Sequence, residues 1–375
     1  MNGEDEFVRA PPTSGGGSPR PGVGRRRWQL GVSVGLFFLT LVSACWAYAV
    51  MRTGASFWAP LAHPSLLLVG WEFAATLLVI LLAHEMGHFL TARRHGVDQS
   101  PPFFIPAPTI FGTFGALILM RSRPPNRRVL LRVAVMGPYG GLLLAIPAAA
   151  WGLAHSVPYD PRVLAASDSL SFGSSILFHL LEQLFSPNGT YVAMHPVALA
   201  GWVGLFVTSL NLIPAAQLDG GHIMYALFGR RHERLSLAVV VILLALGLFV
   251  HLFPEVGPHG ASAGGTRTGE ASGGELWIFW ALLLFVIGIR HPPVEDERAP
   301  LNRGDRLNGL FALVILVLTF VPVPVKYVPA AHVVEPRPGQ QGQDGFFDSQ
   351  PLELPPARTA PYEEGNGRVP EEFDL

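Results

Sequence analysis

The sequence has almost no cysteine and little charge. Its one cysteine, Cys45, has no partner in the chain, which excludes an intramolecular disulfide and a zinc site built from cysteines. Lysine occurs once, at Lys326, and charged residues make up 14% of the chain, against about 25% in soluble domains. The formal net charge is −1. Nucleic-acid binding needs a clustered basic surface, so this charge gives no reason to expect nucleic acid as a partner.

What the sequence has instead is long apolar stretches. Half of its residues are hydrophobic and the mean hydropathy is +0.37. A helix that spans a bilayer needs about 20 predominantly apolar residues. The sequence therefore predicts an all-α polytopic membrane protein with about seven transmembrane helices, surrounded by the lipid bilayer. The seven stretches are roughly 28–51, 64–91, 129–153, 196–217, 235–253, 275–289 and 307–325. A weaker stretch, 170–185, is expected to form an interfacial or re-entrant helix.

The stretches of the chain outside this apolar region define the expected domain organisation. Residues 1–27 and 326–375 are rich in Gly, Pro and polar residues, a composition typical of disordered tails. Residues 28–325 are expected to form one membrane domain, with its chemistry in 64–225. The longest loop between expected spans has roughly forty residues, which is short for an inserted PDZ domain or paired CBS domains. We therefore expect no such regulatory module.

Arginine clusters predict the orientation in the membrane. Cytoplasmic loops carry an excess of basic residues, and here arginines precede the first expected span and recur in every second loop after it. This pattern predicts a cytoplasmic N-terminus and a non-cytoplasmic C-terminal tail, in a cell inner (cytoplasmic) membrane. The clusters lie in 25–27, 93–94, 121–132, 230–234 and 290–306.

The end of the second apolar stretch carries a candidate metal motif. His84 and His88 are four residues apart, so on a helix they share one face and can bind one ion from the same side. Glu85 is positioned by sequence to act as the general base on a metal-bound water. Because two histidines and a glutamate are costly to place in lipid, we expect them to face the interior of the protein and to have a function.

A catalytic zinc site usually has a third protein ligand. The fourth apolar stretch ends near Asp219, after a helix-breaking Pro214 and before two glycines. Span counting brings Asp219 and the histidine motif to similar depths on the cytoplasmic side. His222 is the alternative third ligand. A purely structural alternative for Asp219 is that it only caps the helix that follows and binds no metal.

These two motifs resemble the site-2 protease family of intramembrane zinc metalloproteases. His84-Glu85-Met86-Gly87-His88 corresponds to the family's H-E-x-G-H, and residues 211–221 to its N-x-x-P-x-x-x-L-D-G-G. The resemblance implies that His84, His88 and Asp219 ligate one Zn²⁺ per chain and that Glu85 activates water. It also implies that Asn211 orients or stabilises the reacting carbonyl. Residues 112–116 and 195–205 are similar to the branch that contains plastid membrane proteases and bacterial relatives.

The segment between the second and third stretches is expected to contribute a short membrane-associated β-strand or hairpin near the active site. Its first half is rich in proline, and the residues from Phe111 to Met120 are too few to span the membrane as a helix. We hypothesise that this strand offers an edge to a locally unwound substrate helix. A surface loop that only caps the site is the alternative.

The expected function is that of a zinc metalloendopeptidase that cuts peptide bonds in or near transmembrane segments of single-span membrane proteins, in regulated intramembrane proteolysis. The active site is expected toward the cytoplasmic side. The main alternative is a zinc-binding membrane protein without proteolytic activity, either a pseudoprotease scaffold or a transporter. A different H-E-x-x-H protease with a glutamate as third ligand is a further alternative, but no spanning segment offers an obvious glutamate, and Glu182 lies on the outer side.

Overall fold

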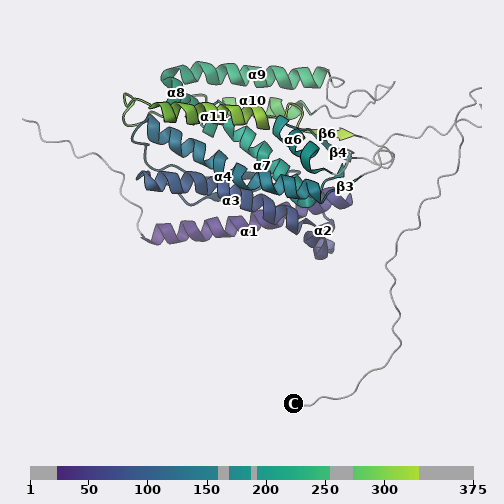
Figure 1. Ribbon diagram of the computed structural model, residues 1–375. Coiled ribbons are helices and arrows are strands. Elements are labelled where there is room, and N and C mark those ends of the chain that lie inside the picture. The colour runs from purple at the N-terminus through teal and green to yellow at the C-terminus, as the bar shows by residue number, and fades with distance from the viewer. Residues whose placement is uncertain (1–22, 159–168, 187–191, 254–272, 329–375) are drawn as a thin grey trace, which may run out of the picture. The chain divides into compact units, whose positions relative to one another are not determined.

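Long helices make up most of the described part of the chain (Figure 1). The computed structural model describes residues 23–158, 169–186, 192–253 and 273–328, which belong to one compact unit. The helices are α1 (Val23–Thr53), α2 (Ala59–Ala62), η1 (Pro64–Gly70), α3 (Trp71–Arg94), α4 (Arg127–Ala154), α6 (Ile176–Phe185), α7 (Pro196–Leu212), α8 (Asp219–Phe228), η3 (Gly229–Arg231), α9 (His232–Leu252), α10 (Glu275–Ile287) and α11 (Arg303–Thr319). The strands are β1 (Phe103–Pro106), β2 (Thr113–Leu117), β3 (Val157–Pro158), β4 (Ser169–Phe172), β5 (Val192–Ala193) and β6 (Val325–Val328).

The expected helical fold is confirmed, whereas the number of spans stays a prediction. Among the described residues, four helical runs are long and apolar enough to cross a membrane: Arg27–Thr53, Pro64–Arg94, Arg127–Ala154 and Asp219–Leu252. The other expected spans are shorter helices, namely α7 with 17 residues, α10 with 13 and α11 with 17. Seventeen residues of helix measure about 25 Å, less than the roughly 30 Å of a bilayer core.

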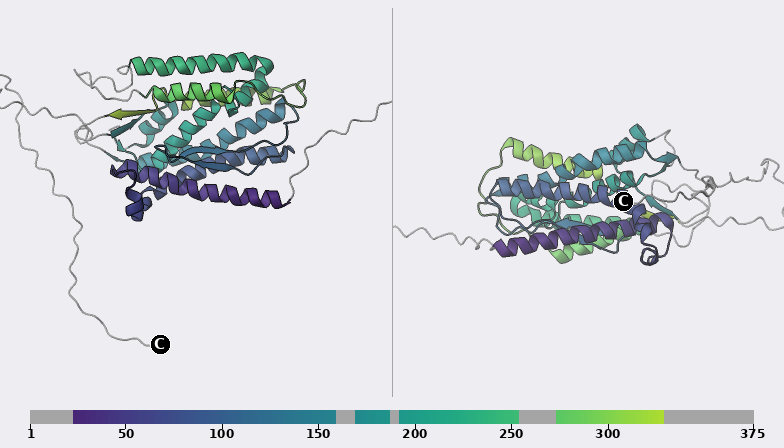
Figure 2. Two further views of the ribbon diagram at one scale, coloured as in Figure 1. Left: turned by 180° about the vertical axis from the view of Figure 1, so that it is seen from behind. Right: turned by 90° about the horizontal axis from the view of Figure 1, so that it is seen from below.

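The helices α3, α4 and α7 pack against one another at the centre. The helix α1 lies at one face of the stack and α9 at the opposite face (Figures 1 and 2). Small residues permit the central contacts: a Cβ atom at Gly201 of α7 would lie 2.5 Å from the backbone nitrogen of Ala149 in α4. At Gly152 of α4, a Cβ atom would lie 2.2 Å from the backbone nitrogen of Ala198. The backbones of α4 and α7 are therefore in direct contact, as small residues allow in membrane helices.

The strands β1 and β2 form the hairpin that the sequence predicts between the second and third apolar stretches. They pair antiparallel, with Phe103 opposite Leu117 and Phe104 opposite Ala116. Phe104 is buried and packs edge-on against Phe37 of α1. Because β1 also contacts α1 and β2 contacts α3, the hairpin is held between α1 and α3. The strand β2 has β1 as its partner in a two-stranded sheet, which leaves its other edge unpaired among the described strands.

The stretch 170–185 differs from its expected helical form. Only its second part is helical, as α6, while Ser169–Phe172 forms β4 and pairs antiparallel with β6. That partner strand lies more than 150 residues away along the chain, so the local sequence carries no signal for the pairing. Residues 326–328 of the expected C-terminal tail belong to β6. Residues 1–22 and 329–375, which make up most of both expected tails, lie outside the described residues.

The contact between α4 and α7 generates a test of the fold. We expect Gly201→Ala to lower the free energy of unfolding by about 1–3 kcal/mol, because the added methyl group overpacks a backbone contact. Thermal unfolding of the purified protein in detergent measures the effect. Gly35→Ala in α1 is the matched control, since a Cβ atom there meets nothing within 4 Å. An equal response of the two variants would contradict the close contact.

Candidate metal centre

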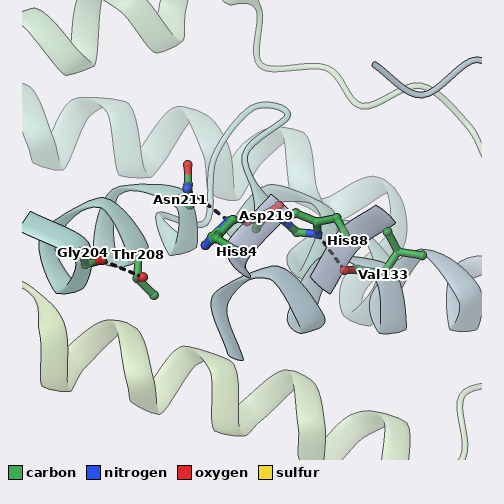
Figure 3. A network of polar contacts seen from close by, with 7 residues as sticks. All are labelled: His84, His88, Val133, Gly204, Thr208, Asn211 and Asp219. Atoms are coloured by element: carbon green, nitrogen blue, oxygen red, sulfur yellow. Dashed lines mark hydrogen bonds and ion pairs between the residues drawn. The ribbon is translucent and has the colours of Figure 1, made fainter. Parts of the chain in front are cut away.

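The histidine motif lies inside the protein, on the second half of α3. His84, Glu85 and His88 are only 3%, 6% and 9% exposed. The sequence Leu-Leu-Val-Ile-Leu-Leu-Ala before them continues the helix without a break, so the three polar side chains are carried to a fixed depth by an apolar helix. A turn of 3.6 residues places His84 and His88 one above the other on the same face. Figure 3 shows both rings turned toward Asp219.

Glycines let α4 approach this face of α3 closely. A Cβ atom at Gly87 would lie 2.1 Å from the carbonyl oxygen of Met136, and one at Gly140 would lie 2.5 Å from that of Ala83. At Gly137 a Cβ atom would lie 2.0 Å from Nε2 of His88. The glycines of the third apolar stretch thus permit close packing of α4 against α3. The space that a side chain at position 137 would fill is the space that the His88 ring occupies.

Asp219 reaches the histidines because the chain turns back after α7. That helix ends at Leu212, and Ala216 in the following loop adopts a positive φ of 53°. The loop is tight: a Cβ atom at Gly220 would lie 2.0 Å from the carbonyl oxygen of Leu212. Only glycine fits there, so the glycine pair after Asp219 allows α8 to begin directly beside the end of α7.

Three potential ligand atoms converge from α3 and α8. Nε2 of His84, Nε2 of His88 and Oδ2 of Asp219 lie 3.2 Å from one another in each of the three pairs. Ligands placed about 2.0–2.1 Å from a tetrahedral zinc ion are about 3.3 Å apart. The cluster therefore has the spacing of three ligands around one such ion, and two nitrogens with one carboxylate oxygen are donors that zinc accepts.

A backbone carbonyl fixes the ring of His88. Nδ1 of His88 lies 2.8 Å from the carbonyl oxygen of Val133 in α4. A carbonyl oxygen only accepts, so Nδ1 carries the hydrogen, and in the neutral ring the lone pair is left on Nε2, which faces Asp219. Such an outer hydrogen bond orients a metal-binding histidine and raises its basicity. Sequence reasoning missed Val133, because a backbone acceptor leaves no trace in residue identity.

The remaining predicted site residues line the same cavity of about 200 Å³. Glu85 borders it beside the two histidines. Asn211, on the last turn of α7, places its Nδ2 3.4 Å from Nε2 of His84 (Figure 3). The hairpin supplies one wall through Ala116, Leu117, Ile118 and Met120, so the strand expected near the active site is there.

Three further histidines, His222, His232 and His291, have surroundings that their neighbours in the sequence do not suggest. His222, the alternative third ligand, lines the cavity but directs Nδ1 to Nε2 of His291, 2.6 Å away. In the sequence His232 and His291 neighbour arginines on the expected cytoplasmic side, which predicts that both side chains are solvated. That prediction is wrong: His232 is 1% exposed and its Nε2 lies 3.0 Å from Oγ of Ser236, while His291 is half-buried and stacks on Tyr225.

Comparisons with known proteins point to one family. Residues 72–254 match peptidase family M50. The chain is similar to the probable zinc metalloprotease EGY1, chloroplastic, of Arabidopsis thaliana, with 31% identity over 253 residues, covering 66% of this chain and 42% of that protein. It is similar to EGY2 of the same plant, with 28% identity over 264 residues, 69% of this chain and 43% of that protein. The matched part thus spans less than half the length of these curated relatives.

The region of similarity contains the whole cluster described above, from the histidine motif on α3 to Asp219 on α8. The family match and the long apolar helices together indicate that the chain is a multi-pass membrane protein. The chain belongs to peptidase family M50, in a branch with the plastid zinc metalloproteases.

Proposed function

We propose that this chain is an intramembrane zinc metalloendopeptidase that hydrolyses peptide bonds in or near the transmembrane segments of membrane proteins. The observation that carries the proposal is the cluster of three ligand atoms, 3.2 Å apart, next to a buried glutamate between apolar helices. His84, His88 and Asp219 would hold one zinc ion. The similarity to the probable zinc metalloproteases EGY1 and EGY2 supports the same activity.

The chain's own residues divide the chemistry between them. When bound, a zinc ion supplies Lewis acidity that polarises a carbonyl and lowers the pKa of water from 15.7 to about 7. Glu85 lines the cavity, where it accepts a proton from the attacking water and returns it to the leaving amine. The amide of Asn211, at the edge of the cluster, orients the reacting carbonyl. The buried cavity limits access of bulk water to these groups.

Single-span proteins are the substrate class that we propose. A peptide bond in a transmembrane helix is shielded by the helix, so the substrate has to unwind before it reaches the cluster. The unpaired edge of β2, which lines the cavity through Leu117, offers backbone partners to such an unwound segment. Antiparallel or parallel addition of one strand would satisfy the substrate's freed backbone groups, which otherwise lack partners in lipid.

The proposed location is a cell inner (cytoplasmic) membrane, with the N-terminus and the active site toward the cytoplasm. The support is the charge pattern: arginines cluster in and beside the connections 95–126, 229–231 and 288–302, which join helix ends on the side of α8 in Figure 1. Residues 28–325 constitute the proposed membrane protease domain, with the motif-bearing core in 64–225. Regulated release of membrane-tethered proteins is the role that this arrangement serves.

The role of Glu85 generates the first test of this function. We expect Glu85→Gln to retain zinc and to lose cleavage by about 10²–10⁴-fold, because the amide cannot act as a base. Zinc content is measured by atomic emission, and cleavage with tagged single-span substrates in lipid nanodiscs. Glu72→Gln, at the other end of the same helix and half-buried beside His195, is the matched control. If wild-type protein binds zinc and cuts no substrate, a zinc-binding scaffold is the better account.

The edge of β2 generates the second test. We expect Leu117→Pro to abolish cleavage and to leave the zinc content unchanged, because proline removes a backbone donor from the strand. Leu117→Ala keeps that donor and serves as the control at the same position. Leu119 is less suitable, since its N–H already donates to Ser100 Oγ. Normal cleavage by Leu117→Pro would leave the hairpin as a cap of the cavity only.

A further inference from the structure

A pair of hydrogen-bonded histidines separates the catalytic cavity from a second one. His222 lies on α8, one turn after Asp219, and lines the catalytic cavity. His291 lies in the connection between α10 and α11 and lines a cavity of about 160 Å³ with Tyr225 and His232. Nδ1 of His222 and Nε2 of His291 are 2.6 Å apart. The proposed chemistry uses neither ring.

The hydrogen bonds of this pair determine its tautomers. Nδ1 of His291 lies 2.6 Å from the carbonyl oxygen of Pro292, which only accepts, so this nitrogen carries the hydrogen. In a neutral ring, Nε2 of His291 is then an acceptor. His222 must donate to it from Nδ1. In a neutral His222, Nε2 is therefore left with a lone pair, and it is the nitrogen available to the catalytic cavity.

The surroundings keep His291 neutral and in place. Its burial and the neighbouring His222 lower the pKa of His291 to about 3, so it is uncharged near neutral pH. Its ring stacks on Tyr225 with centroids 4.1 Å apart, and the Tyr225 hydroxyl donates to Glu297 of the same connection. The backbone N–H of Glu295 donates to Pro124 before α4. The connection is thus tied to both α8 and α4.

We propose that His222 is a substrate-positioning residue whose Nε2 accepts a hydrogen bond from a backbone N–H of the unwound substrate segment, and that His291 holds it in this acceptor form. The proposal deepens the proposed function and rests on it. An unwound segment at membrane depth exposes N–H groups that cost free energy when unpaired. The hairpin and His222 line the same cavity, so the hairpin offers backbone partners and His222, one turn after Asp219, offers an acceptor to one substrate segment.

The test replaces single substrate N–H groups. In a synthetic single-span substrate in nanodiscs, each peptide bond that flanks the cleavage site is exchanged in turn for an ester, which lacks the donor. For wild-type protein we expect one ester position to raise KM about tenfold, the effect of one lost hydrogen bond, with a smaller change in kcat. In His222→Leu the same ester is expected to have no additional effect.

Matched variants separate positioning from general damage. His291→Gln can still accept from Nδ1 of His222 and is expected to keep the ester sensitivity, whereas His291→Leu is expected to reduce it. His251→Leu, at the end of α9, is the control for a histidine remote from the cavity. Equal ester profiles of wild type and His222→Leu at every position overturn the proposal.

A second readout is independent of activity. Nitrogen NMR of ¹⁵N-histidine-labelled protein, with His222→Leu used for assignment, is expected to show His222 protonated at Nδ1 and bare at Nε2 near neutral pH. A hydrogen on Nε2 overturns the acceptor role. If wild-type protein cuts no substrate, the proposed function fails, while the nitrogen spectrum still decides between the two tautomers.

Discussion

The close contact between α3 and α4 is the constraint on which the metal centre depends. The backbone of Met136 occupies the place of a side chain at Gly87, and the ring of His88 occupies that of a side chain at Gly137. This contact brings the Val133 carbonyl within hydrogen-bonding distance of His88 Nδ1, which leaves Nε2 free to bind a metal. A wider helix separation would lose both the hydrogen bond and the ring orientation. The close packing of α3 against α4 therefore determines which nitrogen of His88 can bind a metal.

The third ligand depends on a second constraint, the tight return of the chain after α7. Gly220 lets the start of α8 touch the end of α7, so Asp219 is presented by a helix N-terminus at the depth of the histidines. A carboxylate is stabilised at that end of a helix by the helix dipole. The polar cluster lies between apolar helices, and because charge is costly to bury in a membrane protein, its members face one another inside the protein.

Sequence reasoning predicted the parts of the site that depend on local spacing. The i, i+4 histidines needed only helical periodicity, and the approach of Asp219 followed from counting spans and reading loop charges. The hairpin followed from prolines and from a run too short to span. Sequence reasoning failed where segments that are distant in the sequence meet in space. The pairing of β4 with β6 joins residues such as Leu170 and Tyr327, and the burial of His291 requires the connection before α11 to fold onto α8. Nearby arginines suggested solvent for both His232 and His291, whereas tertiary packing buries them.

The central claim is a metal centre built from two histidines and one aspartate between membrane helices. Zinc K-edge X-ray absorption of the purified protein tests it most directly. The account predicts one zinc ion per chain with only nitrogen and oxygen neighbours at about 2.0–2.1 Å, two of them imidazoles. It also predicts that one imidazole signal is lost in His88→Ala. A chain that retains no stoichiometric metal, or a coordination shell that is unchanged in His88→Ala, would contradict it.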